Sequence, residues 1–410
     1  MAFLLGHLSP PALFLLLHVT TACYTTNVTY STCVENSSPK PYRLYGTRTT
    51  YEHATGLTRD SASRYSVRGC RPLMLMLFMR HTTRYPGLKD MKKFKDRLPA
   101  IRDQMLEADR NNCSMLCKTH LRRLRDWQFE WNIKDENMIT LSGVRDTKRI
   151  GKYSLSAASR YQKRFPWLLP KTFSEKDYKI TVTSKARTRD TASAFMFELL
   201  NRKDFKKADL SGVNDKLLDF HNTCEELLKE KGVRKQDVEE EEKFLDGPAV
   251  KDMVRSLSER TGVDLDIKDV QLMAKMCAFE VALNGSSPFC NLFRKEDLQL
   301  VEYADDLNDY YKDGYGHERN YAQACGVVRE FVSRISRERV GTTTCYRCRR
   351  RRRGLRATLY FSHAGAFKKL MTRLSVHRDP EPLTADAYCD AKENRKWRSS
   401  YYSPFSANLG

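Results

Sequence analysis

The run from Leu73 to Pro86, LMLMLFMRHTTRYP, decides the fold class of this chain. Its first part, Leu73 to Met79, is apolar without interruption, which is typical of a strand buried on both faces of a parallel sheet. A basic segment, Arg80 to Arg84, follows at once. Ligands of open α/β sheets bind outside the carboxyl ends of the strands, so we expect a site at the end of this strand.

Two later stretches have strand character and also lead into polar residues. Residues 178–183 alternate between apolar and polar side chains, and a basic segment that contains Arg187 follows them. Residues 357–361 are mainly apolar and lead into His363. Because the carboxyl ends of parallel strands meet at one edge of a sheet, we expect His81, Arg187 and His363 to converge.

The segments between these strands have helical character. Residues 88–131 and 144–165 are charged and helix-like, and so is most of the stretch before the third strand. The pattern predicts an α/β core into which a mainly α-helical lid, residues 201–335, is inserted. We assign the core to residues 23–200 and 336–410.

Basic residues exceed acidic residues across the chain. The 72 Lys and Arg against 51 Asp and Glu give a formal net charge of +21, which attracts polyanions. Nucleic acid, heparin-like sugars, anionic membranes and polyphosphorylated small molecules all satisfy this charge, and we expect no specific nucleic-acid partner. Five consecutive arginines, Arg349 to Arg353, indicate a polyanion-binding patch, a solvated loop or a proprotein-processing site.

Residues 1–22 have the pattern of a secretory signal peptide. The apolar run from Ala12 to Leu17 precedes small residues that end at Ala22, although no Lys or Arg comes before the run. The alternative is an uncleaved membrane anchor, which Pro10 and Pro11 would interrupt. We expect cleavage near Ala22, a mature chain without a transmembrane span, and a location in the ER lumen or outside the cell. Four N-glycosylation sequons agree with this route: Asn27, Asn36, Asn112 and Asn284.

The twelve cysteines suit an oxidising compartment. Cys277 and Cys290 bracket a short, turn-rich stretch, and we predict a disulfide between them, worth roughly 3 kcal/mol for a loop of this size. Cys345 and Cys348 have the spacing of half a zinc knuckle. No second pair of ligands follows them, which favours disulfides over a metal site, and we predict no metal.

The residue types around His81 suit phosphate chemistry. Arg80 and Arg84 carry planar guanidinium groups, each able to bind two phosphate oxygens at once. A neutral imidazole can attack phosphorus to form a phosphohistidine, which divides one difficult step into two easier ones. Arginines can neutralise charge on the transferred group meanwhile. Taken alone, an Arg-His pair after a strand is more often a surface turn.

The segment from Arg80 to Pro86 resembles the RHGxRxP signature of the histidine acid phosphatases, in the RHxTRYP form found in multiple inositol polyphosphate phosphatases. The resemblance extends over nearly the whole chain after the signal segment. It is carried in order by Gly46–Glu52, Cys224–Leu228, Phe244–Pro248, Tyr311–Gly316 and Glu381–Ala385. It implies a three-layer α/β sandwich of the phosphoglycerate mutase-like type with an α-helical lid, and a phosphatase that acts on inositol polyphosphates such as phytate.

The resemblance also assigns roles to individual residues. It implies that His81 is the nucleophile, that Arg80, Arg84 and Arg187 bind phosphate, and that His363 is a second catalytic residue that holds the transferred phosphoryl group. It implies no cofactor. The substrate expected from the resemblance, a small polyanion, agrees with the positive charge of the chain.

Two residues depart from the family pattern. Thr82 stands where the family has glycine, and it would be strained if that position required a positive φ. Gly365 stands where the family has the carboxylic acid that protonates the leaving alcohol, so the general acid is unknown, with Asp190 and Glu381 as candidates by their nearness to family motifs. The alternative function is therefore a catalytically impaired pseudophosphatase that binds phosphorylated ligands.

The last residues, Asn408 to Gly410, resemble the opening of a family strand. We therefore expect the C-terminal part of the core to be missing from this sequence. Either the gene model is incomplete, or the product lacks one edge of its sheet.

Overall fold

The structure is a computed structural model, and it describes residues 43–55, 72–147, 157–223, 237–343 and 355–410. Several predicted features lie outside these described residues. They are the signal segment 1–22, the sequons at Asn27 and Asn36, the cysteines Cys345 and Cys348, and the arginine run Arg349 to Arg353. None of the described helices is both long and apolar enough to cross a bilayer.

Four strands form a mixed sheet in the order β2-β3-β1-β4. β1 (Leu75–Arg80) and β2 (Tyr178–Thr181) both run parallel to β3 (Ala357–Ser362), which lies between them. β4 (Asn408–Leu409) pairs antiparallel with β1. The three strands predicted from sequence are confirmed, and β1 extends one residue further than expected, to Arg80.

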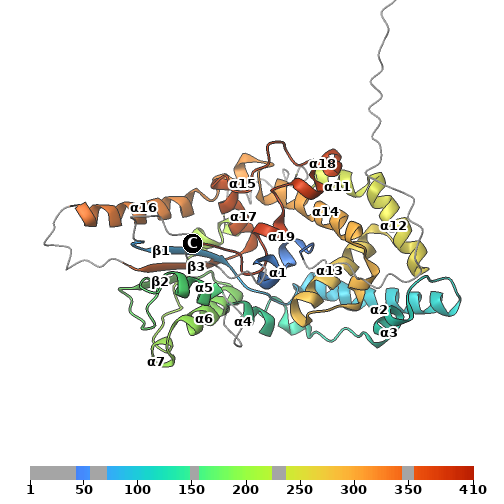
Figure 1. Ribbon diagram of the computed structural model, residues 1–410, viewed down its shortest axis with the longest axis horizontal. Helices are drawn as coiled ribbons and strands as arrows, with labels where there is room; N and C mark the ends of the chain where they lie inside the picture. The colour runs from blue at the N-terminus through green and yellow to red at the C-terminus, as the bar shows by residue number, and fades with distance from the viewer. Residues whose placement is uncertain (1–42, 56–71, 148–156, 224–236, 344–354) are drawn as a thin grey trace, which may run out of the picture. The chain divides into compact units, whose positions relative to one another are not determined.

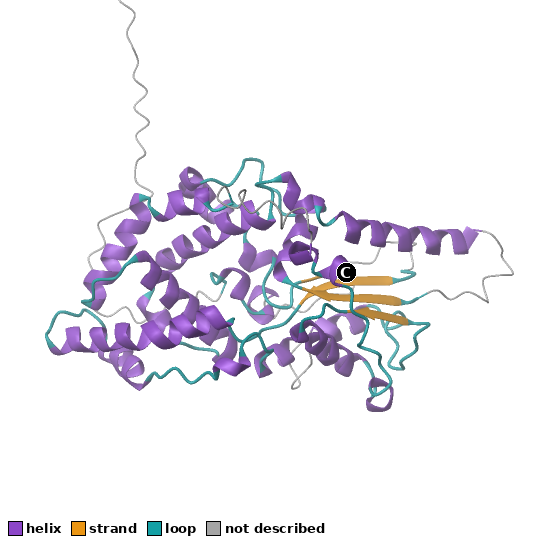
Figure 2. Ribbon diagram, turned by 180° about the vertical axis from the view of Figure 1, so that it is seen from behind, coloured by secondary structure: helices purple, strands orange, loops and turns teal. Residues whose placement is uncertain are grey.

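Helices cover both faces of this sheet, which makes the core a three-layer α/β arrangement (Figures 1 and 2). On one face, α5 (Ala157–Arg164) and α6 (Ala186–Leu199) enclose a hydrophobic core with the sheet, in which Phe195 and Phe361 have ring centroids 5.6 Å apart. On the other face, α17 (Ala364–Arg373) contacts β1. Burial on both faces explains why β1 and β3 are apolar along nearly their whole length.

The remaining chain is mainly helical, as the sequence predicted for the inserted region. α2 (Leu88–Arg110) and α3 (Lys118–Asp126), which the sequence assigned to the core range, pack against α13 (Ile267–Asn284) and the 3-10 helix η5 (Pro288–Leu292) of the inserted range. The other long helices are α12 (Pro248–Thr261), α14 (Lys295–Asp313) and α16 (Cys325–Thr343), and the shorter α11 (Glu239–Leu245) precedes α12. Short elements complete the described chain: η1 (Gly46–Arg48), α1 (Tyr51–Thr55), η3 (Ile133–Asp135), α4 (Leu141–Thr147), α7 (Arg202–Phe205), α8 (Asp215–Leu218), α9 (Phe220–Thr223), α15 (Glu318–Ala322), η7 (Ala385–Ala387), α18 (Tyr388–Asn394) and α19 (Ser399–Tyr402).

A disulfide closes the end of α13. Cys277 and Cys290, the pair predicted from sequence, are bonded, and their Cα atoms are 4.9 Å apart. The loop between them carries Asn284, whose side chain is exposed, as is that of Asn112 at the second described sequon. The disulfide thus fixes η5 against the helix that precedes it.

The last described residues hold the loop after β1 in place. The backbone N–H of Arg80 donates to the carbonyl of Ala407 at 2.8 Å, and the N–H of Ser406 donates to the carbonyl of His81 at 3.3 Å. Upstream of this segment, the buried Arg395 pairs with Glu302 at 3.0 Å and with Asp306 at 2.7 Å, both on α14. The C-terminal residues are therefore tied to the helical part at one end and to the β1 loop at the other.

Candidate active site

Two histidines meet at the carboxyl ends of the central strands. His81 follows β1, His363 follows β3, and their ring centroids are 5.6 Å apart with the planes at 62°. The parallel register brings them together, because Arg80 lies opposite Ser362 and the N–H of His81 donates to the Ser362 carbonyl at 2.8 Å. Both side chains are buried.

The hydrogen bonding of His81 fixes which of its ring nitrogens carries the proton. Nδ1 lies 2.9 Å from the carbonyl oxygen of Thr82. A carbonyl can only accept, so Nδ1–H is the donor, and Nε2 of the neutral ring keeps its lone pair. A neutral imidazole held in this tautomer is a nucleophile with a defined attacking atom.

Three guanidinium groups surround the histidines without carboxylate partners at salt-bridge distance. Arg80 donates to the carbonyls of Thr47 at 2.5 Å and of Ser403 at 2.7 Å, which fixes its position. Arg84 follows in the loop, and Arg187 lies in the first turn of α6. The Nε atoms of all three are buried and have no hydrogen-bond partner in the described protein. Buried polar groups usually have partners, so this arrangement favours an anion that would accept these hydrogen bonds.

The electrostatics of the cluster follow from its uncompensated charge. Burial, and then the charges of Arg80 and Arg84, hold the pKa of His81 well below its usual 6.5. Burial and the charge of Arg187 lower the pKa of His363 to about 2. Burial, with Arg187 as the leading charge, lowers the pKa of Arg84 to about 10. Both histidines are therefore neutral at physiological pH, as a nucleophilic imidazole must be.

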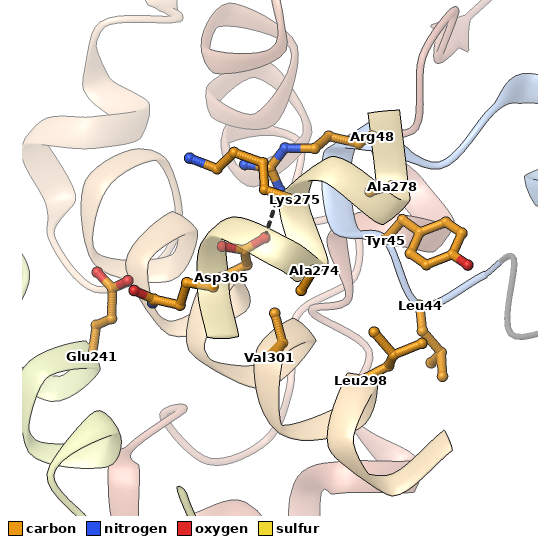
Figure 3. A pocket seen from close by; sticks show the side chains of 11 residues that line it. Leu44, Tyr45, Arg48, Glu241, Ala274, Lys275, Ala278, Leu298, Val301 and Asp305 are labelled. Atoms are coloured by element: carbon orange, nitrogen blue, oxygen red, sulfur yellow. Dashed lines mark hydrogen bonds and ion pairs between the residues drawn. The ribbon is translucent and has the colours of Figure 1, made fainter. Parts of the chain in front are cut away.

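A fourth arginine, Arg48, lies near the cluster but is paired. Its guanidinium lies 2.8 Å from Asp305, and although burial opposes it, this carboxylate raises the pKa of Arg48. Figure 3 shows this ion pair in the wall of a hollow of about 220 Å³, whose lining also includes Lys275 and Glu241. His81 and His363 do not line this hollow. Arg48 therefore contributes a charge that is already compensated, unlike that of Arg80.

His363 has further neighbours besides His81. Its Nε2 lies 3.0 Å from the hydroxyl of Thr183, which follows β2, and 3.8 Å from a carboxylate oxygen of Asp219. The ring of His221 lies with its centroid 6.0 Å from that of His363. Sequence reasoning missed Asp219, which lies between α8 and α9, and His221, which lies in the short α9, because this region has no motif of its own.

The candidates for the missing acid lie elsewhere. Asp190 is half-buried on α6, where burial raises its pKa, and Glu381 is exposed in the loop after α17. Neither carboxylate is hydrogen-bonded or ion-paired to His81 or His363. Gly365 occupies the second position of α17, next to His363. A Cβ atom built on Gly365 would lie 2.7 Å from Cδ2 of His221, so the imidazole occupies the space into which a side chain at 365 would extend.

Thr82 fits its position without backbone strain. Thr82 is not one of the described residues that have a positive φ, so its β-branched side chain causes no backbone strain. Its N–H donates to the hydroxyl of Thr191 at 3.1 Å, and its hydroxyl donates to the carbonyl of Gly143 at 2.7 Å. The same hydroxyl accepts from Ser406 at 2.9 Å. The threonine thus joins the loop after β1 to two helices and to the C-terminal segment.

The comparisons with known proteins agree on one family. The model of the histidine phosphatase superfamily (branch 2) matches residues 73–410. Multiple inositol polyphosphate phosphatase 1 of Drosophila melanogaster is 27% identical over 379 residues, which cover 90% of this chain and 75% of that protein. The human protein of the same name is 27% identical over 397 residues, with 91% and 77% covered.

Solved structures share the fold. The phytase from D. castellii has a TM-score of 0.60 and 17% identity, covering 91% of this chain and 78% of that one. The multiple inositol polyphosphate phosphatase of Bifidobacterium longum, solved with inositol hexasulfate, has a TM-score of 0.58 and 15% identity, covering 89% and 87%. The resemblance noted from the sequence motifs is therefore supported by both kinds of comparison.

Proposed function

The chain belongs to branch 2 of the histidine phosphatase superfamily, and we propose that it is a phosphomonoesterase that releases phosphate from inositol polyphosphates through a phosphohistidine at His81. One observation carries the proposal. A neutral imidazole with a free Nε2 lies among three buried guanidinium groups whose Nε atoms lack partners. That combination supplies both a nucleophile for phosphorus and donors for the phosphate oxygens.

The first half of the reaction uses these groups together. Nε2 of His81 attacks phosphorus, the P–N bond forms, and the bond from phosphorus to the leaving inositol oxygen breaks in line with it. Arg80, Arg84 and Arg187 donate to the oxygens of the transferred group, whose charge they neutralise. His363 holds one of these oxygens from the opposite side, which its distance of 5.6 Å from the ring of His81 supports.

The second half returns the enzyme to its starting state. Water attacks the phosphohistidine, the P–N bond breaks, and inorganic phosphate leaves with the neutral imidazole restored. The low pKa of His81 supports both steps, because it keeps the free ring neutral for attack in acid and makes the imidazole a better leaving group from phosphorus. The N–H of Nδ1 stays on the Thr82 carbonyl throughout, which keeps the ring in one orientation.

The substrate class rests on charge and on relatives. Three buried arginines without carboxylate partners at salt-bridge distance, and a net charge of +21 on the chain, suit a substrate that carries several phosphates. Relatives covering about nine-tenths of the chain are named multiple inositol polyphosphate phosphatases. A structural neighbour of that name was solved with inositol hexasulfate.

A pseudophosphatase remains the second candidate, and Gly365 is the observation that favours it. The residue has no side chain that could protonate the leaving oxygen, and general acid catalysis is typically worth about 10²- to 10⁴-fold. Such a protein would bind inositol polyphosphates and form the phosphohistidine slowly or not at all. Activated esters would separate the two candidates, because their leaving groups need little protonation.

We also propose that the protein works in the secretory pathway, in the ER lumen or outside the cell. The signal-like segment 1–22 and the sequons support this location. The bond between Cys277 and Cys290 supports it further, because disulfides persist in oxidising compartments. Immunolocalisation of the full chain, with and without residues 1–22, tests the proposal, and cytosolic protein in both cases would contradict it.

The proposed activity is tested by phosphate release from inositol hexakisphosphate between pH 3 and pH 7, a range of about four units that spans the acid side of an ordinary histidine. We expect wild-type protein to release phosphate and His81→Ala to release none, with both proteins folded by circular dichroism. Release that survives in His81→Ala would assign the activity to a contaminant or to another site. Absence of release from wild-type protein, with tight binding of the ligand, would favour the pseudophosphatase.

A further inference from the structure

The side chain of His221 occupies the space beside Gly365, where the family has the carboxylic acid that protonates the leaving group. Gly365 lacks the side chain that would reach toward the leaving group, and the ring of His221 lies against it, 2.7 Å from the built Cβ position to Cδ2 and 3.1 Å to Nε2. The fit is mutual, since any larger residue at 365 would displace the imidazole. The absence of a side chain at Gly365 therefore leaves the space that the imidazole of His221 occupies.

Asp219 gives the imidazole of His221 the surroundings of an acid-base group. Nδ1 of His221 lies 3.5 Å from a carboxylate oxygen of the buried Asp219 but makes no hydrogen bond in the described protein. Nε2 accepts from the side-chain amide of Asn222 at 3.3 Å, so in the neutral ring the proton is on Nδ1, toward Asp219. The same amide donates to Asp219 at 2.9 Å. A carboxylate near Nδ1 stabilises the protonated form of the ring through its negative charge.

Protonation changes what Nε2 can contact. An Nε2–H cannot receive the amide hydrogen of Asn222, so the imidazolium loses this partner and needs an acceptor elsewhere. The ring of His363 lies beside it, with centroids 6.0 Å apart, and the centroids of His363 and His81 are 5.6 Å apart. His221 therefore lies one imidazole ring away from His81, against the residue that stands where the family has its general acid.

We propose that His221 is the proton donor for the leaving inositol oxygen, with Asp219 as its positioning residue, in place of the acid that Gly365 lacks. This inference rests on the proposed phosphatase function and deepens it. In the first step, the P–O bond to inositol breaks as the P–N bond to His81 forms, and the proton of His221 Nε2 moves to the departing oxygen. In the second step, water attacks phosphorus, its proton moves to His221 Nε2, and the P–N bond breaks.

The charges around His221 set the pH range in which it can donate. Burial lowers its pKa, Lys368 and Lys369 on α17 lower it further, and Asp219 and Asp313 act in the opposite direction. His363 faces it as a neutral ring. In the free protein, His221 is therefore protonated only below pH 6.5. The negative charge of a bound polyanion raises the pKa of His221. Activity toward inositol phosphates is thus expected to fall as the pH rises through the pKa of His221.

The test compares two substrates that differ in their need for a proton. His221→Phe keeps an aromatic ring and removes the donor. We expect it to lower kcat on inositol hexakisphosphate by about 10²- to 10⁴-fold and to leave kcat on p-nitrophenyl phosphate within a few-fold, because nitrophenolate leaves without protonation. His317→Phe is the matched control, since this histidine also faces a carboxylate, Asp237 at 3.2 Å, but contacts Tyr311 and not His363.

A rescue variant separates loss of the proton from loss of packing. Gly365→Glu combined with His221→Ala restores a carboxylic acid and removes the ring that would clash with it. We expect this double variant to regain at least about tenfold of the lost kcat on inositol hexakisphosphate, within the range that general acids supply. His221→Ala alone is expected to remain as slow as His221→Phe.

Each outcome decides the proposal. Equal losses on both substrates, or no loss on either, would overturn the role of His221 while leaving wild-type phosphatase activity intact. Failure of the proposed function differs, because wild-type protein would then release phosphate from neither substrate. If the His221 variants do not fold, the wild-type pH profiles decide: an alkaline decline for inositol hexakisphosphate that p-nitrophenyl phosphate lacks supports the donor, and identical profiles contradict it.

Discussion

The backbone N–H of His81 donates to the carbonyl of Ser362, the residue before His363, at a distance of 2.8 Å. This bond continues the parallel ladder of β1 and β3 one step beyond Arg80, so the two histidines leave the sheet at the same level. Their separation of 5.6 Å between ring centroids is therefore set by strand register rather than by loop conformation. A site placed in this way is rigid before any ligand binds, as phosphoryl transfer requires.

Arg80 and Arg187 are expected to respond differently to replacement by Lys. Arg80 donates to the half-buried carbonyl of Thr47 and the buried carbonyl of Ser403, so Arg80→Lys leaves at least one unpaired, at a cost of about 1–3 kcal/mol in the free energy of unfolding. No described protein group accepts a hydrogen bond from Nε of Arg187, so Arg187→Lys should lower kcat/KM with little change in stability. Urea unfolding and steady-state kinetics measure the two effects. A destabilised Arg187→Lys protein would show that this arginine is structural.

The stability of the ligand-free protein should fall in acid because of its buried histidines. His81 and His363 have folded-state pKa values below the 6.5 of an unfolded chain, so the unfolded state binds more protons between these values. The contribution of these two histidines to the free energy of unfolding is fully present above pH 6.5 and is lost as the pH falls toward their folded-state pKa values. We expect Tm to decrease from pH 7 to pH 4, a span of about three units across the histidine range.

Anion binding should reverse part of this loss. Sulfate keeps its charge across the same range and, bound among the arginines, raises the pKa of both histidines. The increase in Tm caused by sulfate should therefore grow as the pH falls. An increase that is the same at every pH would mean that sulfate binds away from His81 and His363.

Thr82 is expected to contribute to stability through its hydroxyl. Thr82→Val keeps the shape of the side chain but leaves the carbonyl of Gly143 and the hydroxyl of Ser406 without this partner, at a cost of about 1–3 kcal/mol. Thr82→Ser retains the hydroxyl and should cost less. Urea unfolding of the two variants gives the comparison, and equal losses would place the contribution in the methyl group instead.

The disulfide between Cys277 and Cys290 should stabilise the helical part more than the site. Replacing both cysteines by Ser is expected to cost about 2–4 kcal/mol in the free energy of unfolding. The site is built from the ends of β1 and β3 and from α6, so kcat at a temperature where the variant is folded should change little. A large loss of kcat at full folding would show that α13 and η5 position the site.

The sequence alone predicted the parts of the fold that local burial dictates. β1 and β3 lie between two helical layers, so their residues are apolar almost throughout, and that pattern is visible in the chain. The convergence of the basic residues after β1 with His363 after β3 was predicted from the rule that ligands bind at the carboxyl ends of parallel strands. The family motifs added the roles of Arg187 and His363, whose surroundings local patterns do not describe.

Other features depend on contacts between distant segments, which no local pattern reveals. His221 and Asp219 reach Gly365 and His363 only because α9 folds back onto α17. Similarly, Ser406 supports the β1 loop through hydrogen bonds whose partners are polar residues of ordinary appearance. The absence of strain at Thr82 could not be predicted either, because the φ angle of this residue, which decides whether a β-branched side chain is strained, follows from the folded backbone.

The central claim is that His81 carries the phosphoryl group, and trapping that intermediate tests it most directly. Wild-type protein is mixed with p-nitrophenyl phosphate, quenched in alkali to preserve phosphohistidine, digested and analysed by tandem mass spectrometry. The account predicts phosphate on the peptide that contains His81, at Nε2 by fragmentation and chemical standards, and none in His81→Ala. Phosphate on His363 or His221 instead, or turnover of the ester with no labelled histidine, would contradict it.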